Sequence, residues 1–187
     1  MSDKKEIVDV ILKMVVISAI AAALLGLTYG PTQSKLKELQ AEQQKEALME
    51  ILPAAADFNE VTEGEDEEGN PIVLYYQGVD ASGNIVGYAV RQEQVGCQGM
   101  IELMVGISAD YASITGMQVM KHSETPGLGA LIVEEDFRTQ FIDIPVTDVS
   151  LQSKGGQVDA ITGATISSQA VVDALHKAVD YVAAQEA

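Results

Sequence analysis

Apolar residues near the start of the chain form an almost unbroken run. Residues 14–29 carry no charge, and Val10, Ile11 and Leu12 lengthen the apolar segment to 20 residues that only Lys13 interrupts. A helix of that length spans about 30 Å, the thickness of the hydrocarbon core of a bilayer. The pattern predicts a single transmembrane anchor within residues 1–30. The alternatives are a buried core helix and a cleaved signal peptide, although the alanines lie inside the run rather than at a cleavage site after it.

A second helical pattern follows the apolar run. Leucine and isoleucine residues form a broken stripe between Thr32, which can cap a helix, and Leu52, which precedes Pro53. Proline lacks a backbone N–H and ends a helix at the residue before it. We therefore expect a helical stalk over residues 31–53, between the anchor and a folded domain.

The rest of the chain alternates between strand-like runs and turns. Runs rich in Val, Ile and Tyr are separated by short Asp-, Ser- and Gly-containing connections, which favour antiparallel pairing. A short helix is expected over residues 134–141, and apolar positions at helical spacing predict an amphipathic helix from Ile166 to about Ala183. Residues 54–187 should therefore form an α+β domain with a mostly antiparallel sheet and packed helices. The predicted strands are Ile72–Val79, Ile85–Arg91, Met100–Ile107 and Ile114–Met120.

The charge of the chain is uneven. Among its 187 residues are 11 Lys and Arg and 28 Asp and Glu, a net charge of −17, all of it beyond residue 30. This balance argues against nucleic-acid binding, which needs a basic face. Six acids within residues 60–69 predict a solvated loop. Lys4, Lys5 and Lys13 precede the anchor and favour a cytoplasmic N-terminus, which places the acidic domain outside the cytoplasm.

Cysteine and histidine are scarce. Cys97 is the only cysteine, so no disulfide scaffold and no zinc site built on cysteine pairs can form. The histidines are His122 and His176, and no metal site is expected. We interpret Cys97, in the sequence Gly96-Cys-Gln-Gly99, as a structural residue.

Two motifs carry candidate chemistry. The first, Asp159-Ala-Ile-Thr-Gly-Ala-Thr-Ile-Ser-Ser168, leads into the final predicted helix. Unpaired N–H groups and the positive end of the dipole favour an anion at a helix N-terminus. The alternative is ordinary capping by Thr165 or Ser167 with nothing bound. The second motif, Glu124-Thr-Pro-Gly-Leu-Gly129, is a turn whose glycines allow close backbone approach, or simply a connecting loop.

Together the two motifs resemble those of a known family. The D-x-x-T-G-A-T-x-S-S run is similar to the flavinylation signature of FMN-binding domains. The E-T-P-G-L-G run is similar to a second hallmark of that domain in two electron-transport complexes, the Rnf complex (an ion-translocating ferredoxin:NAD oxidoreductase) and the sodium-pumping NADH:quinone reductase. One span followed by an acidic domain of this length resembles the G-subunit family of the Rnf complex.

The resemblance implies a set of site residues. FMN would be joined covalently, through its phosphate, to the hydroxyl of Thr165, because the last Thr of the motif carries it in the family. The family uses a separate flavin transferase, with FAD and magnesium, that reads the positions of Asp159, Gly163, Ala164 and Thr165. The implied flavin contacts are Glu124, Thr125, Leu128, Gly129, Thr162, Gly163 and Ala164. Lys154 is added on charge alone, as a partner for the phosphate or a flavin carbonyl.

The implied function is electron transfer rather than independent catalysis, so no catalytic residue is expected. The chain would be a membrane-anchored subunit of a redox-driven ion-translocating oxidoreductase, and it would relay electrons between the redox centres of other membrane and peripheral subunits. The sequence leaves two alternatives open. One is the C subunit of the sodium-pumping NADH:quinone reductase, which is usually longer. The other is a membrane-tethered binding module without flavin.

Overall fold

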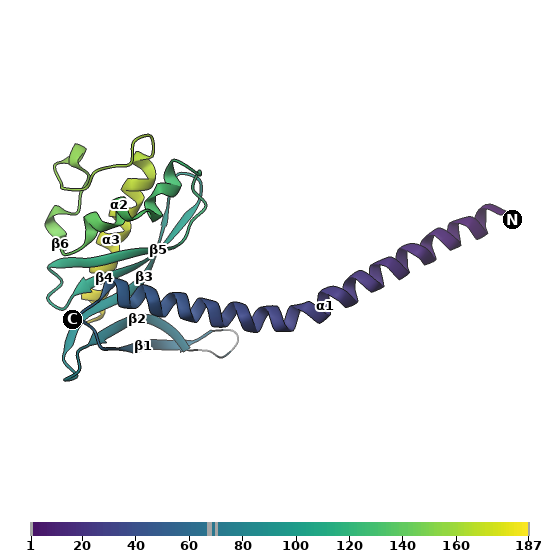
Figure 1. Cartoon of the computed structure of the whole chain (residues 1–187), viewed down its shortest axis with the longest axis horizontal. Helices are drawn as coiled ribbons and strands as arrows, with labels where there is room; N and C mark the ends of the chain where they lie inside the picture. Colours follow the sequence, from purple (N-terminus) through teal and green to yellow (C-terminus); the bar gives the residue numbers. More distant parts are fainter. Residues whose placement is uncertain (1, 67–68, 70, 187) are drawn as a thin grey trace. The chain divides into compact units, whose positions relative to one another are not determined.

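The computed structural model describes residues 2–66, 69 and 71–186. The chain divides into two compact units, Met1–Lys45 and Glu46–Ala187. Helix α1 (Ser2–Ile51) makes up the first unit as far as Lys45 (Figure 1). Its last residues, from Glu46 on, belong to the second unit. The prediction that a new helix begins at Thr32 is wrong, because α1 continues through Gly30 and Pro31. Proline removes one backbone hydrogen bond inside a helix and does not have to end it.

Large apolar side chains are exposed along the first part of α1, among them Ile17, Leu25 and Tyr29. Within the part of the chain that the structure describes, no helix has a segment long and apolar enough to span a bilayer. The transmembrane anchor within residues 1–30 therefore stays a prediction.

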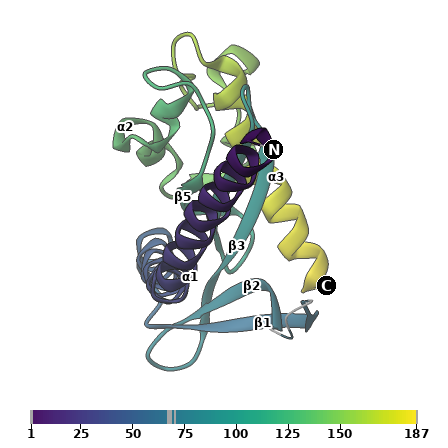
Figure 2. The same cartoon turned by 90° about the vertical axis from the view of Figure 1, so that its right-hand side faces the viewer.

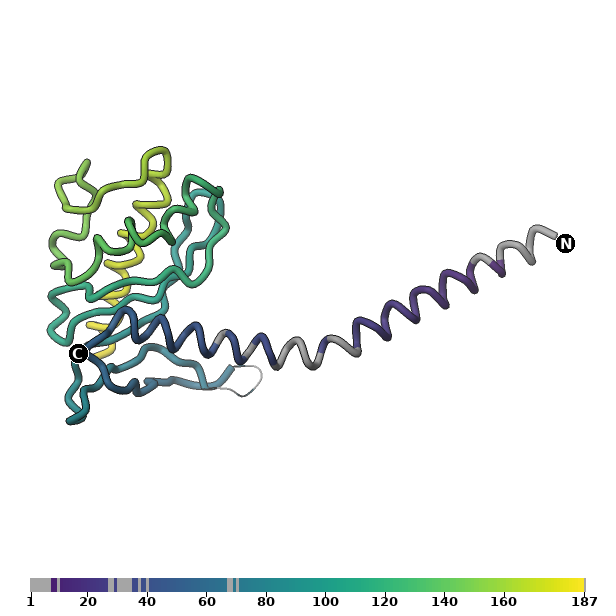
Figure 3. Tube along the Cα trace, viewed as in Figure 1, coloured from purple at the N-terminus to yellow at the C-terminus, as the bar shows by residue number. Residues whose placement is uncertain are grey.

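The second unit is built on one antiparallel sheet in which the six strands follow one another in chain order. Figure 3 traces the backbone through this unit, from blue through green to yellow at the C-terminus. The four predicted strands, the short helix and the final helix are confirmed, and with them the α+β class. The strands are β1 (Asp57–Glu65), β2 (Pro71–Val79), β3 (Ile85–Val95), β4 (Met100–Ser108), β5 (Ser113–Lys121) and β6 (Ile144–Pro145). The helices are η1 (Gly129–Val133), α2 (Glu135–Arg138), η2 (Thr139–Phe141), η3 (Val146–Asp148), η4 (Gln152–Lys154) and α3 (Thr165–Gln185).

The acidic segment is a strand where the sequence predicts a loop. Residues 60–65 lie in β1, which pairs with β2 at the edge of the sheet. The side chains of Glu60, Glu63 and Glu65 are exposed, as expected for solvated acids. Charged side chains on an edge strand oppose pairing with a further chain. Residues 67 and 68 of the predicted loop lie outside the described residues.

Alternating side chains divide the core between the two faces of the sheet. Tyr88 and Val90 of β3 belong to the main core beneath α3, which packs along β3 and β4 (Figure 2). Ala89, between them, belongs to a smaller cluster with Leu48, Ile51 and Leu52, at and just beyond the end of α1. The end of α1, predicted as part of the stalk, is thus a buried part of the domain.

Glycines make room for the end of α1. A Cβ at Gly106 of β4 would lie 2.6 Å from the carbonyl oxygen of Ile51, and one at Gly116 of β5 would lie 3.2 Å from its Cα. The two glycines are register partners on neighbouring strands. Thr115 donates a 2.6 Å hydrogen bond to the same Ile51 carbonyl and so satisfies an acceptor that the helix end leaves unpaired.

Candidate functional site

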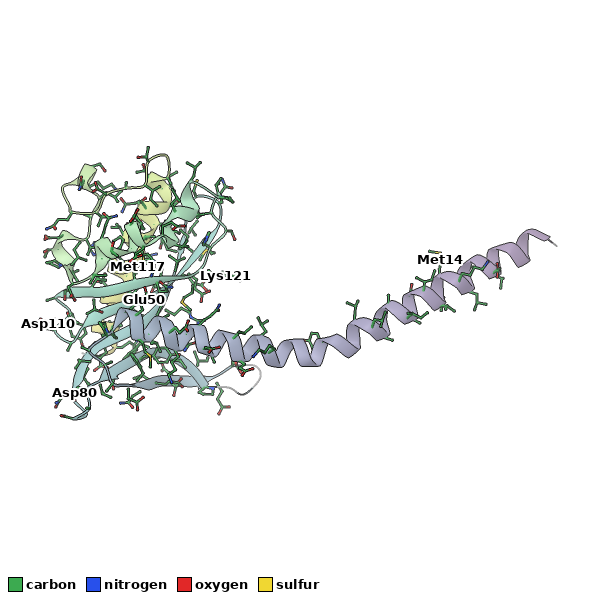
Figure 4. All side chains as sticks on the ribbon, viewed as in Figure 1. Met14, Glu50, Asp80, Asp110, Met117 and Lys121 are labelled. Carbon is green, nitrogen blue, oxygen red and sulfur yellow. The ribbon has the colours of Figure 1, made fainter. Side chains whose placement is uncertain are left out.

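Three segments distant in sequence meet at one end of the domain. They are the β3–β4 turn at residues 96–99, the loop that leaves β5 after Lys121 (labelled in Figure 4), and the turn that precedes α3. Together they enclose a hollow of about 400 Å³, here called the threonine pocket. Its lining residues are Cys97, Gln98, Glu124, Thr125, Leu128, Gly129, Gly163, Ala164, Thr165, Ile166 and Ser167.

The turn before α3 is held by backbone and serine hydrogen bonds. The Ala164 N–H donates to the Ile161 carbonyl at 2.9 Å. Gly163 has a φ of 80°, in the left-handed region that favours glycine. Ser168 donates to the Ala164 carbonyl at 3.1 Å and accepts from the Ile161 N–H at 3.0 Å. The last serine of the motif therefore fixes the turn in which the motif's glycine lies.

Helix α3 has no side-chain cap at its N-terminus. The N-cap residue is Ala164, and both predicted caps, Thr165 and Ser167, lie inside the helix. Thr165 is exposed, and its hydroxyl forms no hydrogen bond to any other described residue. The prediction of side-chain capping is therefore wrong. An exposed hydroxyl stands beside uncapped N–H groups at the positive end of the helix dipole, where an anion is stabilised.

Glu124 lines the same pocket as Thr165 and is a buried carboxylate, only 4% exposed. Its Oε2 accepts a 2.6 Å hydrogen bond from Ser167 Oγ, and its Oε1 accepts one of 3.0 Å from the Gln98 N–H. Burial acts to raise the pKa of Glu124, but the hydrogen bonds from Ser167 and from the N–H groups of residues 97–99 outweigh it and hold the pKa below its usual value. Glu124 is therefore ionised at neutral pH.

Glycines on two sides leave space for this carboxylate. A Cβ at Gly129 would lie 2.5 Å from Glu124 Oε2 and 2.6 Å from Ser167 Oγ. A Cβ at Gly96 would overlap Glu124 Oε1. The last glycine of the E-T-P-G-L-G motif thus makes room for the hydrogen bond that joins the two motifs.

Buried polar side chains are concentrated at this site. Among the residues whose side chains the structure describes, the buried polar or charged ones are Glu124, Ser167 and Ser168. Burying such groups is costly unless they are hydrogen-bonded, and all three are. The structure thus brings the two sequence motifs together into one hydrogen-bonded unit.

The other predicted contacts in the second motif also line the threonine pocket. Thr125 and Leu128 are exposed, and Leu128 is close enough to Gly163 that a Cβ there would lie 3.2 Å from its Cδ2. Thr162 is exposed in the turn and is not among the lining residues. Leu128 and Ile166 provide exposed apolar surface at the pocket, with Ile166 62% exposed. Ile166, an apolar position of the predicted amphipathic helix, is therefore not on its buried face.

Lys154 lines a second hollow of about 330 Å³, which also includes Thr165 and Ile166. Gln169, one helical turn after Thr165, lines it as well. Its Oε1 is the one buried side-chain oxygen or nitrogen, among the residues described, that has no hydrogen-bond partner. Sequence reasoning missed Gln169 and Ile166, although their spacing from Thr165 on a predicted helix could have placed them beside it.

Asp159 lies apart from Thr165. It lines a different hollow, of about 280 Å³, together with Gln140 and Glu134. The Gln140 side chain accepts from the Asp159 N–H at 2.7 Å and donates to its carbonyl at 3.4 Å. The side chain of Asp159 is exposed, so it is accessible to another protein.

Cys97 is exposed and lines the threonine pocket. Cys97 is thus not part of the core, and its interpretation as a structural residue stays a prediction. The short Gly96–Gly99 turn places it there, since the Gly96 N–H donates to the Gly99 carbonyl at 2.7 Å and the two residues between them project outward.

Comparisons with known proteins agree with this geometry. Residues 96–180 match the model of the FMN-binding domain family, from the β3–β4 turn to near the end of α3. The fold is similar to that of the C subunit of a Na⁺-translocating NADH-quinone reductase from Parabacteroides distasonis, with a TM-score of 0.54 and 21% identity over 77% of this chain and 92% of that one. The family match identifies an FMN-binding domain, and the solved structure shares its fold.

Whole-chain relatives define the family more narrowly. The chain is 71% identical, over the full length of both proteins, to the G subunit of an ion-translocating oxidoreductase complex from Methanosarcina acetivorans. It is 33% identical to the G subunit of a Na⁺-translocating ferredoxin:NAD⁺ oxidoreductase complex from Acetobacterium woodii, over 95% of this chain and 92% of that protein. The chain belongs to the G-subunit family of the ion-translocating oxidoreductase (Rnf) complexes.

Proposed function

We propose that this protein is an electron-transfer subunit of an ion-translocating ferredoxin:NAD oxidoreductase and carries FMN covalently on Thr165. The observation that carries the proposal is the exposed Thr165 hydroxyl in a hollow at the uncapped N-terminus of α3. FMN supplies the one- or two-electron chemistry when bound. Family membership and the FMN-binding domain support the assignment.

The residues around Thr165 fit a flavin phosphate. The N–H groups of the first turn of α3 and the lysine of the second hollow favour its negative charge. Gly163 and Ala164 bring the backbone close without bulky side chains, while the exposed apolar surfaces of Leu128 and Ile166 suit the ring. We propose direct contacts from Thr125, Leu128, Gly129, Thr162, Gly163, Ala164 and Lys154.

We propose that the bond is formed by another protein, because no described residue forms a hydrogen bond to the Thr165 hydroxyl that could activate it. A threonine hydroxyl is a weak nucleophile that needs an adjacent base. The buried carboxylate of the pocket, Glu124, already accepts hydrogen bonds from Ser167 and from N–H groups of the 96–99 turn. A flavin transferase would therefore join Thr165 Oγ1 to the flavin phosphorus of FAD, break the pyrophosphate bond, release AMP and remove the hydroxyl proton. Asp159, exposed beside its own hollow, would be read by that enzyme.

The proposal extends to the membrane. Exposed apolar side chains along the first part of α1, within an uncharged sequence, support a single-pass anchor with a cytoplasmic N-terminus and an extracytoplasmic FMN domain. Redox partners would be the other membrane and peripheral subunits of the complex. Carbonate washing of membranes tests the anchor, because a spanning helix stays in the pellet and a peripheral protein is released.

Intact mass and in-gel fluorescence test the flavin assignment. The full chain is expressed with and without a flavin transferase, denatured, separated on a gel and viewed under ultraviolet light. We expect a fluorescent band with one added FMN that maps to the Thr165 peptide. Thr165→Ala should abolish it, whereas Thr147→Ala, at an exposed threonine of η3, should not. Fluorescence that survives Thr165→Ala, or a dark band beside a labelled positive control, would contradict the proposal.

A further inference from the structure

Glu124 connects all three segments of the site through one side chain. It follows β5, its Oε2 binds Ser167 in the first turns of α3, and its Oε1 binds the turn between β3 and β4. The segments are separated by 26 and 43 residues of sequence. No other described charged residue is buried. The carboxylate thus links the three segments that form the site.

The same contacts leave the carboxylate little capacity for a ligand. Each oxygen already accepts a hydrogen bond from the protein, and the residue is 4% exposed. A bound flavin would therefore meet the surface that Glu124 supports more than Glu124 itself. The negative charge nevertheless stays within the wall of the threonine pocket, where burial weakens screening by solvent.

We propose that Glu124 is a positioning residue that holds the three segments of the threonine pocket together, and that its buried charge lowers the redox potential of a flavin bound there. This inference rests on the proposed function. Reduction adds electrons to the flavin, and a nearby fixed anion makes that addition less favourable. The flavin would therefore be a stronger reductant than the same flavin beside a neutral side chain.

The variant Glu124→Gln removes the negative charge and keeps the hydrogen bonds that join the three segments. The amide keeps an oxygen for the N–H groups of residues 97–99, and its NH₂ faces Ser167, whose hydroxyl can rotate to accept. The full chain, loaded with covalent FMN and in detergent, is titrated by spectroelectrochemistry at pH 7. We expect the midpoint potential to rise by about 30 mV. For a two-electron couple this corresponds to a roughly tenfold higher ratio of reduced to oxidised flavin at a given potential.

Two variants serve as controls for that shift. Glu60→Gln removes the same charge from exposed β1, at the far edge of the sheet, and should leave the potential at the wild-type value. Glu124→Asp keeps the charge and should remain near wild type. A Glu124→Gln potential equal to that of Glu60→Gln would overturn the proposed charge effect, and so would an equally large shift in Glu124→Asp. Should Glu124→Gln fail to fold, Glu124→Ala, which also removes the charge, takes its place in the titration.

The positioning role has a readout that needs no flavin. In the apo chain, amide hydrogen exchange of residues 97–99 should quicken at least tenfold in Glu124→Ala and stay near wild type in Glu124→Gln. Unchanged exchange in Glu124→Ala would overturn this role. If the hydrogen-exchange or redox result contradicts the expectation while FMN is still found on Thr165, the inference about Glu124 is rejected and the proposed function stands. Loss of the Thr165 assignment in the mass measurement rejects the proposed function.

Discussion

Ser167 Oγ donates a hydrogen bond of 2.6 Å to Glu124 Oε2, and both residues are buried although 43 positions separate them in the sequence. One belongs to the motif that ends in the helix carrying Thr165, the other to the glycine-containing loop after β5. This bond joins the two motifs in space. Each supplies half of a buried polar contact that would be costly if either half were missing.

The hydrogen bond between Ser167 and Glu124 should contribute measurably to stability. Ser167→Ala removes one donor to a buried charged oxygen, so we expect a loss of about 2 kcal/mol in the free energy of unfolding. Urea denaturation of the detergent-solubilised chain measures it. Ser153→Ala, at an exposed serine of η4, should change stability by less than about 0.5 kcal/mol. Equal effects in the two variants would contradict the prediction.

Stability should fall in acid through Glu124. Its pKa is lowered in the folded state, so its contribution is complete above the unfolded value of about 4.3 and disappears as the pH falls through the folded pKa. The stability advantage of wild type over Glu124→Gln should therefore shrink below about pH 4. Urea midpoints between pH 3 and pH 7 measure it. Asp80 and Asp110, whose pKa values are also lowered, are common to both proteins and cancel. An advantage that is independent of pH would exclude Glu124 as the source.

The close approach of α1 to the sheet should make Gly106 intolerant of a side chain. In Gly106→Ala the new Cβ would overlap Thr115 Oγ1 and lie 2.6 Å from the Ile51 carbonyl, which is backbone and cannot easily move. We expect a loss of about 1–3 kcal/mol. Gly116→Ala meets its nearest atom at 3.2 Å and should cost less. Thermal unfolding followed by circular dichroism ranks the two, and the reverse order would show that the end of α1 does not set the constraint.

Arg138 should matter more to stability than Arg91. Its side chain, 19% exposed, pairs with Glu50 of α1 at 2.5 Å and also binds Gln118 and the Val133 carbonyl. Arg138→Met should cost about 1–2 kcal/mol, because it leaves several polar groups without a partner. The side chain of Arg91 is 50% exposed and lies 3.1 Å from Glu102. Arg91→Met should therefore lower the free energy of unfolding by less than about 1 kcal/mol. Chemical denaturation compares the two, and a larger loss in Arg91→Met would show that Arg138 does not fasten α1.

Much of the domain could be predicted from local pattern. The spacing of apolar residues predicted the four central strands and α3, because each element reveals in its own residues which face it buries. The motif around Thr165 indicated a turn followed by a helix that begins with exposed N–H groups. The sequence pattern gave a wrong prediction where contacts with other parts of the chain determine the local structure. The acids of β1 suggest a loop, yet the strand forms because β2 supplies its hydrogen bonds. Gly30 and Pro31 suggest a break that α1 does not contain.

The sequence by itself therefore predicted the four central strands and α3, the resemblance to flavin-binding subunits, and the Thr165 hydroxyl as the candidate to carry the cofactor. Only the tertiary structure decided which polar groups are buried and what they bind. The partnership of Glu124 with Ser167 and Gln98 depends on distances through space, which no spacing along the chain encodes. Ile166 shows the same limit, because it fits the apolar stripe of α3 and is nevertheless exposed beside Thr165. Burial is a property of the surroundings that the whole chain creates, so it exists only once the distant segments have come together.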